Sequence, residues 1–552
     1  MKRIVAIVAG PLNSMSAVGT LLALVFFAAS LTPSLMPRSW LIQGLLSGTC
    51  AAVGYMIGVF IGWLWQYLEL PWLKKYVLLE RAVTLAAAIV LSTIFLWQSV
   101  GWQNSIRELW NMELLDSSAP LRLAATASAT FLVLFLVGRL FRLATDRLSA
   151  WLDRYVPRRV SNVIGVTIAA AVFWSLAQGV VLRLALDAAD ASFQSADSLM
   201  EADTQQPENP AMTGSAASLV SWEGLGRQGR RYVTAGPRGR AIGDFWGSSA
   251  LDPVRVYVGL NNAESVEERA VLALEELKRQ GGFERSVLVV VAPTGTGWID
   301  PAAMDTLEYL HQGDVASVAL QYSYLSSWLS LLVEPEQGLD AARALFQEVY
   351  SYWKDLPRDQ RPRLYLHGLS LGALNSQMAT DIYDVVGNPF QGALWSGPPF
   401  RSQRWASVTA TREAGSPAWL PRFRDGSVVR FSNQTTAPEG EYASWSAIRF
   451  IYLQYASDPI VFFDPTSFYR EPDWLKGVRG PDVSTRFRWI PIVTGLQLVF
   501  DMAIATSAPI GFGHVYAPEH YIDAWISLTE PPAVDLEVSA RLKETLPAAA
   551  FQ

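Results

Sequence analysis

The sequence predicts two structural classes in one chain, a multi-span α-helical membrane region followed by a domain of the α/β class. Three observations support this prediction. Long apolar segments without charged side chains fill the first 185 residues, short β-branched runs alternate with helical patterns after about residue 215, and a Gly-X-Ser-X-Gly pentapeptide joins a strand pattern to a helix pattern. A chain of 552 residues is also too long for one ordinary core.

Composition narrows the classes of function. The chain is 51% hydrophobic and 17% charged, against about 25% charged in typical soluble proteins, so part of it is expected to face lipid. A net charge of −6 without a long basic run argues against a nucleic-acid partner. The lone cysteine, Cys50, excludes a disulfide framework and a cysteine metal cluster. No metal or organic cofactor is implied.

Five segments free of Asp, Glu, Lys and Arg lie within residues 1–185, the expected membrane domain. They are Met15–Leu35, Leu41–Trp65, Ala82–Val100, Leu123–Gly138 and Val163–Leu182. A helix needs about 20 apolar residues to cross a hydrocarbon core of roughly 30 Å. The structural alternative for any one segment is a buried core helix or a re-entrant piece, but five together favour a multi-pass domain, with four or six spans as alternatives.

The Lys and Arg residues near these segments predict an orientation. They concentrate before the first span, between the second and third, and between the fourth and fifth, as Lys2, Arg3, Lys74, Lys75, Arg81, Arg139, Arg142, Arg147, Arg154, Arg158 and Arg159. Positively charged loops stay in the cytoplasm. The C-terminal domain is therefore expected outside the cytoplasmic membrane, after a linker at residues 186–214 that is rich in Ala, Ser, Asp and Glu.

Residues 215–552 are expected to form the α/β domain. The candidate strands are Val254–Val258, Ser286–Val291, Ser317–Gln321, Leu364–His367, Gly392–Trp395 and Phe450–Gln454, and the clearest helical patterns are Val266–Gln280 and Leu339–Asp355. Strands that alternate with helices predict a mostly parallel sheet.

The pentapeptide Gly368-Leu-Ser-Leu-Gly372 carries the candidate nucleophile, Ser370. It lies between the strand pattern ending at His367 and a helical pattern from Ala373 to Tyr383, which places Ser370 on a sharp turn. Glycines flank such a turn because it leaves no room for side chains. A glycine-lined turn that only caps a helix is the structural alternative.

A serine nucleophile requires a histidine base and a carboxylate that orients it. Of the four histidines, His311 and His367 precede the pentapeptide, and His520 opens a helical pattern. His514, in the glycine turn Gly511-Phe-Gly-His514, is therefore the preferred base. The preferred acid is Asp458, which follows the strand Phe450–Gln454. Asp464 and Asp501 are the competing carboxylates.

Stabilisation of an oxyanion requires two backbone donors. One is expected from the N–H of Leu371, directly after the nucleophile. The other is assigned to the loop after the strand Ser286–Val291, at Thr294, Gly295 or Thr296. An ordinary glycine-rich turn is the structural alternative for this loop.

Three further segments have distinctive sequence patterns. Gly224-Leu-Gly-Arg-Gln-Gly229 matches a dinucleotide fingerprint, but no strand precedes it, so a structural or phosphate-contacting loop is expected. Residues 401–447 are rich in Arg and aromatic residues and are predicted to form a lid-like insertion. The apolar segment Trp489–Ala505 fits a membrane-interface helix, an acyl pocket or plain core packing equally well.

Several motifs together resemble a bacterial family of membrane α/β-hydrolases over nearly the whole chain. They are Trp222-Glu-Gly-Leu-Gly-Arg-Gln-Gly-Arg-Arg, Val254-Arg-Val-Tyr-Val-Gly-Leu260, His367-Gly-Leu-Ser-Leu-Gly372, Ala456-Ser-Asp-Pro459 and Gly513-His-Val-Tyr516. The resemblance implies an α/β-hydrolase fold and a site at Ser370, and it implies no particular substrate.

The expected function is hydrolysis of carboxylic esters through an acyl-Ser370 intermediate. Membrane lipids or lipid-linked esters are the expected substrates, because the site would stand beside a bilayer at the bacterial inner membrane. Two alternatives stay open: an acyltransferase that uses the same three residues, and a non-catalytic scaffold or binding protein of the cell envelope with a hydrolase fold.

Overall fold

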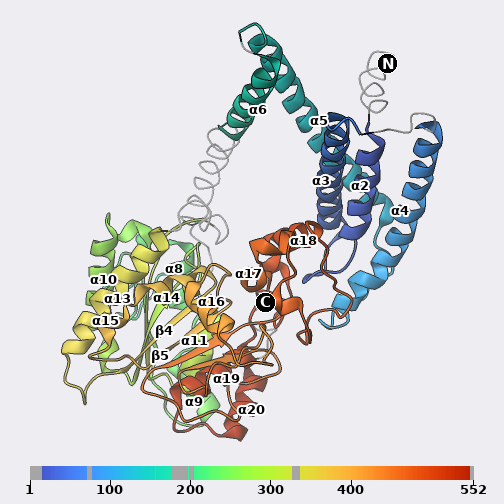
Figure 1. Ribbon diagram of the computed structural model, residues 1–552. Coiled ribbons are helices and arrows are strands. Elements are labelled where there is room, and N and C mark those ends of the chain that lie inside the picture. The colour runs from blue at the N-terminus through green and yellow to red at the C-terminus, as the bar shows by residue number, and fades with distance from the viewer. Residues whose placement is uncertain are drawn as a thin grey trace. The chain divides into compact units, whose positions relative to one another are not determined.

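The computed structural model describes residues 15–70, 77–155, 157–175, 197, 204–325 and 336–546 (Figure 1). The chain forms two compact units. The helical unit comprises Met1–Leu186 together with Phe463–Ile504, and the sheet unit comprises Asp187–Phe462 together with Ala505–Gln552. The C-terminal half of the chain is thus shared between both units.

A seven-stranded sheet in the order β1-β3-β2-β4-β5-β7-β6 is the centre of the sheet unit, and every neighbouring pair is parallel. The strands are β1 Val254–Val258, β2 Val287–Ala292, β3 Val315–Leu320, β4 Arg363–Leu369, β5 Gly392–Ser396, β6 Val429–Ser432 and β7 Arg449–Leu453. All residues of β1, β2 and β3 are buried, as in sheets covered on both faces. The predicted α/β class is confirmed.

Two groups of helices contact the sheet. The first contains α10 Val266–Arg279, α13 Gln337–Asp355 and α14 Leu371–Ala379, and the second contains α11 Pro301–Leu310 and α19 Pro518–Thr529. α8 Gly226–Ala235 also contacts β1. The other described α-helices of this unit are α9 Gly239–Trp246, α15 Ile382–Val385, α16 Gln403–Ala410, α17 Pro459–Phe462 and α20 Leu536–Thr545. Neighbouring helices within each group pack on one another, so the strands bury apolar side chains against helices of both groups.

A helix occurs at each of the five predicted spans. They are α2 Ala17–Ser30, α3 Trp40–Tyr67, α4 Val77–Arg107, α5 Pro120–Leu152 and α6 Arg158–Ser175. Among the described residues, only α3 and α5 are long and apolar enough to cross a membrane, so five spans are not confirmed. The last part of the fifth predicted span, residues 176–182, lies outside the described residues.

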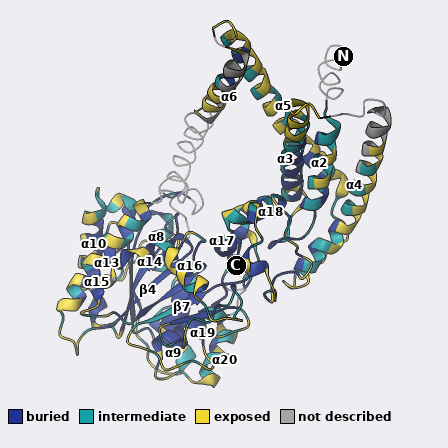
Figure 2. Cartoon of the chain, in the orientation of Figure 1, coloured by how far each residue is buried: buried dark blue, intermediate teal, exposed yellow. Residues whose placement is uncertain are grey.

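The surface of α5 is exposed and apolar. Figure 2 shows exposed positions along most of this helix, and they include Leu132, Val133, Leu136 and Val137. Only 11% of its most apolar window is buried, against 44% for α3. A core helix of a soluble protein would bury this stripe, so its exposure is consistent with a lipid-facing helix. The helix also continues beyond Gly138, the predicted end of the span.

The domain boundary predicted at residues 215–552 needs correction, because Phe463–Ile504 belongs to the helical unit. Within this segment, α18 Val493–Ala503 packs against α2 and α3. A fully buried ion pair joins the segment to the N-terminal residues, with Arg38 Nε 2.9 Å from Asp501 Oδ1. The apolar pattern of Trp489–Ala505 was visible in the sequence, but the helices α2 and α3 that it packs against lie more than 400 residues earlier in the chain.

The predicted lid at residues 401–447 also needs correction. It contains α16 and the strand β6, which extends the sheet by pairing with β7. The four residues of β6 are too few to show a periodic pattern, so the strand escaped prediction. The predicted linker 186–214 is described at Asp197 and from residue 204 onward, and its last part packs on the sheet unit, where Thr213 Oγ1 donates to the Arg255 carbonyl at 2.9 Å.

Candidate active site

Ser370 occupies a strained turn between β4 and α14. Its φ of 57° and ψ of −123° are unusual for a residue with a side chain. The turn requires glycine on both sides. A Cβ on Gly368 would lie 2.3 Å from the carbonyl carbon of Gly372, and one on Gly372 would lie 2.1 Å from the Ala292 oxygen. The strained strand-to-helix geometry is that of a nucleophile elbow.

Asp458 and His514 form a buried pair at the same edge of the sheet. Asp458 follows β7 and precedes α17, and its Oδ2 lies 2.6 Å from His514 Nδ1. The N–H of Ile460 donates to Asp458 Oδ1 at 2.8 Å, and Tyr516 Oη donates to Oδ2 at 2.7 Å. These bonds fix the carboxylate, which in turn fixes the orientation of the imidazole.

The loop after β5 connects the imidazole with the elbow. The N–H of Ser370 donates to the carbonyl of Ser396 at 3.0 Å. The next residue, Gly397, has a φ of +51°, and a Cβ there would lie 2.7 Å from His514 Cε1. His514 Nε2 is buried and has no hydrogen-bond partner among the described residues. In the absence of substrate, a base and its nucleophile commonly lie beyond hydrogen-bond distance and approach when substrate binds.

Comparison with known protein families agrees with this geometry. Residues 254–542 match a model described as an alpha/beta-hydrolase family, and residues 31–237 match the N-terminal region of an alpha/beta-hydrolase family. The chain belongs to the alpha/beta-hydrolase family. No curated protein and no solved structure matches it. Because hydrolase folds support many activities, membership in the family does not fix the activity, which depends on the residues of the site.

The other three histidines of the chain make structural hydrogen bonds. His311 Nε2 lies 2.8 Å from Thr529 Oγ1, and His367 Nδ1 lies 2.9 Å from the Leu394 carbonyl. Burial lowers the pKa of His311 to about 3 and that of His367 to about 4. His520 contacts Tyr455 Oη at 2.5 Å, and burial lowers its pKa to about 4. All three are therefore neutral at physiological pH.

The two competing carboxylates have other partners. Asp464 accepts hydrogen bonds from the backbone and the hydroxyl of Thr466, and so caps the short helix Pro465–Phe468. Asp501 pairs with Arg38 in the helical unit. Of the three predicted carboxylates, only Asp458 contacts His514.

The expected oxyanion donors lie at the start of α14 and in the loop after β2. Leu371 is the first residue of α14, a position whose N–H has no partner within the helix. The close contact between Gly372 and Ala292 brings the end of β2 to the elbow. However, the N–H of Thr294 donates to the Trp298 carbonyl at 2.9 Å, so this geometry does not support Thr294 as a donor. Leu371 and Gly295 stay predictions.

Tyr516 and Gly397 are site residues that the sequence reasoning did not assign. Tyr516 is buried, and burial followed by the nearby Asp458 carboxylate raises its pKa well above the ordinary value, so it stays a donor. Its position two residues after His514 is the only local signal. Gly397 directly follows the strand β5. Glycine is common at the ends of strands, so its position alone does not predict a site residue.

The fingerprint at Gly224–Gly229 is a packing motif in this structure. Gly226, with a φ of +68°, lies against the Asp197 carboxylate, which accepts a hydrogen bond from the Arg227 N–H at 3.0 Å. A Cβ on Gly229 would lie 2.5 Å from the Tyr257 ring. A carboxylate of the chain itself thus occupies the start of α8, as expected of a structural loop.

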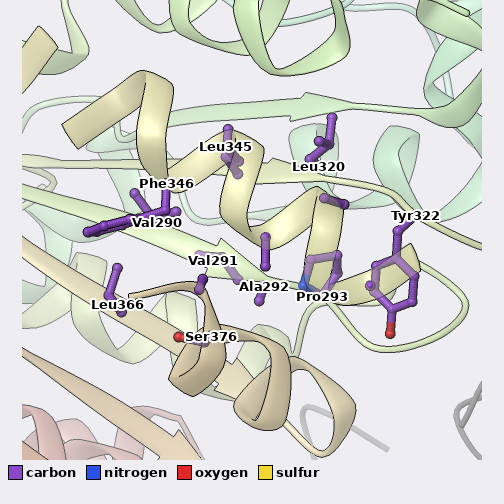
Figure 3. A pocket seen from close by; sticks show the side chains of 14 residues that line it. Val290, Val291, Ala292, Pro293, Leu320, Tyr322, Leu345, Phe346, Leu366 and Ser376 are labelled. Atoms are coloured by element: carbon purple, nitrogen blue, oxygen red, sulfur yellow. The ribbon is translucent and has the colours of Figure 1, made fainter. Parts of the chain in front are cut away.

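Tight packing beneath the elbow supports it. Figure 3 shows Leu345 and Phe346 of α13 facing Val290 of β2 and Leu366 of β4, with Ser376 of α14 nearby. The hollow between them has a volume of about 10 Å³, room for about one water molecule. It is too small for a substrate, so these side chains act as support for the β2 and β4 ends.

Asp300 is a second buried carboxyl group near the site. It caps α11 through the N–H of Ala302, and its Oδ2 accepts a hydrogen bond from Tyr521 Oη at 3.0 Å. Burial raises the pKa of Asp300 from 3.8 to about 7, against the opposing effect of the hydrogen bonds that Tyr521 and the Ala302 N–H donate to it. Between about pH 4 and pH 7, Asp300 therefore stays protonated in the folded protein, whereas the same carboxyl group is ionised in the unfolded chain.

Asp300→Asn is expected to flatten the dependence of stability on pH. Because the folded-state pKa is raised, the native free energy of unfolding falls as pH rises from about 4 to about 7, by roughly a few kcal/mol. The difference in melting temperature between Asp300→Asn and the native protein should therefore shift in favour of the variant when the pH is raised from 5 to 8. Melting at both pH values measures this. Asp535→Asn, at an exposed helix cap, is the control. The prediction would be contradicted if the difference in melting temperature between Asp300→Asn and the native protein were the same at both pH values.

Proposed function

We propose that this protein is a membrane-anchored serine hydrolase that cleaves carboxylic esters of lipids or lipid-linked molecules. The observation that carries the proposal is the buried Asp458–His514 pair at the sheet edge that also presents Ser370 on its strained turn. Within the described part of the chain, His514 Nε2 has no hydrogen-bond partner. Membership in the hydrolase family supports it. The apolar helices α3 and α5 support a membrane anchor.

The proposed reaction proceeds in two stages. His514 Nε2 takes the hydroxyl proton of Ser370 as Oγ attacks the ester carbonyl carbon, and Asp458 stabilises the imidazolium that forms. Collapse of the tetrahedral intermediate breaks the ester bond, and the departing alcohol receives the proton from His514. Water, deprotonated in turn by His514, then attacks the acyl-serine and releases the acid. Backbone N–H groups, including that of Leu371, stabilise each oxyanion.

The location of the site suggests the class of substrate. A multi-pass inner-membrane anchor with an extracytoplasmic hydrolase unit would give the site access to esters supplied by the bilayer. This proposal follows from the Lys and Arg distribution of the N-terminal region and from the apolar surface of α5. An acyl acceptor other than water would make the same three residues an acyltransferase.

Labelling with a fluorophosphonate probe tests the proposal. The probe reacts with an activated serine, so native membranes should show a labelled band that is lost in Ser370→Ala and His514→Ala. Ser407→Ala, at an exposed position of α16, should label normally. If the native protein stays unlabelled while a known serine esterase in the same membranes reacts, the site is not catalytic and a scaffold role replaces the proposal. Product analysis with an activated ester then separates hydrolysis from acyl transfer.

A further inference from the structure

A polar cavity of about 180 Å³ lies within the helical unit, at one end of α3, α4 and α5. Its lining comes from three places along the chain. Trp40 and Gln43 belong to the first turn of α3, which Ser39 precedes, and Gln103 and Arg107 belong to the last turns of α4. Ser118, Ala119 and Leu123 at the start of α5 complete it. The catalytic residues proposed above are in the other unit.

The lining of this cavity carries a net positive charge. Arg38 lines it, but the buried carboxylate of Asp501 neutralises this arginine. Arg107 donates from Nη1 to the Glu113 carbonyl at 2.7 Å and makes no ion pair within the described part of the chain. The lining contains no Asp or Glu residue. An anion in the cavity would therefore meet one uncompensated cation and no opposing charge.

Two buried nitrogen donors of the lining have no acceptor among the described residues. Gln103 is 4% exposed, and its Oε1 accepts a hydrogen bond from the Arg38 N–H at 2.8 Å. This bond assigns the two ends of the amide, so Nε2 is a donor, and it has no partner among the described residues. The Nε of Arg107 is likewise buried without a described partner. Leaving a buried donor unsatisfied destabilises a fold, and an anionic ligand in the cavity would accept from these donors.

Two helices begin at the cavity. The first turn of α3 follows Ser39, and α5 begins at Pro120 after Ala119, whose side chain provides no cap. A helix N-terminus carries a partial positive charge and favours anions. The Ile42 N–H at the start of α3 already donates to Ser39 Oγ, so the start of α5 is the terminus that reinforces the preference set by Arg107 and Gln103.

A larger apolar cavity lies along the adjacent turns of the same helices. Its volume is about 500 Å³, and its lining includes Leu96 of α4 and Ala124, Phe131 and Phe135 of α5, together with Phe27 of α2. Leu96 lies one helical turn before Ser99, which lines the polar cavity, and Ala124 directly follows Leu123. A charged end and an apolar end thus adjoin along α4 and α5.

We propose that these two cavities form one binding site for a lipid with an anionic, phosphate-bearing headgroup. The phosphate accepts hydrogen bonds from Arg107 and Gln103, and an acyl chain fills the apolar cavity. Free phosphate would satisfy the polar end alone, whereas the adjoining apolar cavity favours a lipid as the source of the headgroup. The site does not depend on Ser370 being catalytic, although it would bring lipid to a hydrolase of lipid esters.

Binding of short-chain lipids to the purified full-length protein in neutral detergent tests this site. Dioctanoyl phosphatidic acid, dioctanoyl phosphatidylcholine and inorganic phosphate would be titrated separately, with calorimetry as the readout. We expect phosphatidic acid to bind most tightly and Arg107→Gln to weaken its binding by roughly tenfold or more, since a charge-assisted hydrogen bond is lost. Arg142→Gln, at an exposed position of α5 outside both linings, should bind normally.

A second pair of variants separates the two ends of the site. Ala124→Phe fills the apolar cavity and should weaken phosphatidic acid binding. Gln103→Leu removes the buried donor and tests the headgroup end should Arg107→Gln not fold. Ser370→Ala should bind phosphatidic acid as the native chain does, so a failure of the proposed enzyme activity would be distinguished from a failure of this site.

Two results would overturn the proposal. Equal binding of phosphatidic acid and phosphatidylcholine, with no effect of Arg107→Gln or Gln103→Leu, would show that the polar cavity does not select anions. Binding of inorganic phosphate as tight as that of phosphatidic acid, unchanged in Ala124→Phe, would show a phosphate site without a lipid. Preferential binding of phosphatidic acid that is lost in both headgroup and apolar variants supports the site as described.

Discussion

Replacing Asp458 by Asn is expected to lower the rate of ester hydrolysis by about 10³–10⁴-fold. The buried carboxylate accepts from His514 Nδ1 at 2.6 Å, and so selects the tautomer whose Nε2 can act as a base. An amide at this position would stabilise neither that tautomer nor the imidazolium that forms during attack. Steady-state hydrolysis of an activated ester by the purified protein measures the loss, with thermal melting to show that the variant folds.

Two variants calibrate this result. Asp464→Asn alters a carboxylate on the same stretch of chain that caps a short helix and does not contact His514, so its activity should stay close to native. Tyr516→Phe removes one hydrogen bond to Asp458 Oδ2 and is expected to cost about tenfold in rate, because the Ile460 N–H still holds the carboxylate. Near-native activity of Asp458→Asn would show that another group orients His514.

Asp501→Ala is expected to destabilise the helical unit by about 3–5 kcal/mol, because it leaves Arg38 buried without a counter-charge. The pair is completely buried. Asp501 also accepts a hydrogen bond from the Leu35 N–H at 3.1 Å, and the nearby Gln497 Nε2 donates to the Thr32 carbonyl at 2.9 Å. The substitution thus removes a link between α18 and the segment before α3. Thermal or denaturant unfolding in detergent would report the change.

The double variant Arg38→Met with Asp501→Leu distinguishes lost charge pairing from lost packing. Apolar residues of similar size avoid an unpaired charge, so the double variant should be more stable than Asp501→Ala. Asp473→Ala removes an exposed partner of Lys476 in the same segment, and it should have little effect because surface pairs contribute about 0–1 kcal/mol. A double variant as unstable as Asp501→Ala would contradict the explanation based on buried charge.

The segment that contains Asp501 begins shortly after Asp458 and ends shortly before His514. The chain therefore leaves the sheet unit between the proposed acid and base, folds with the N-terminal helices and returns. Trp110 Nε1 donates to the Asp482 carbonyl at 2.9 Å, and the hydroxyls of Ser105 and Ser484 lie 2.7 Å apart. These contacts show that the inserted segment is an integral part of the helical unit.

Local patterns in the sequence were sufficient for the α/β class, six of the seven strands and the strained turn at Ser370. Buried parallel strands appear as short β-branched runs, and the elbow needs glycine at fixed positions. Both features can therefore be recognised from residues that are adjacent in the sequence. The choice of Asp458 after the strand β7, and of His514 later in the chain, followed from chain order, although the described residues directly before His514 form α18 and a short 3-10 helix, and no strand. Their 2.6 Å contact was not predictable, since it depends on two loops that meet in space.

The tertiary structure alone decided which residues surround these groups and where the chain divides. Tyr516, Gly397 and the ion pair of Arg38 with Asp501 join positions whose sequence separation carries no periodic signal. The apolar helix α18 is compatible with a core, an interface or a pocket until its partner is known. Periodicity shows that a face is apolar, whereas only packing shows what covers it.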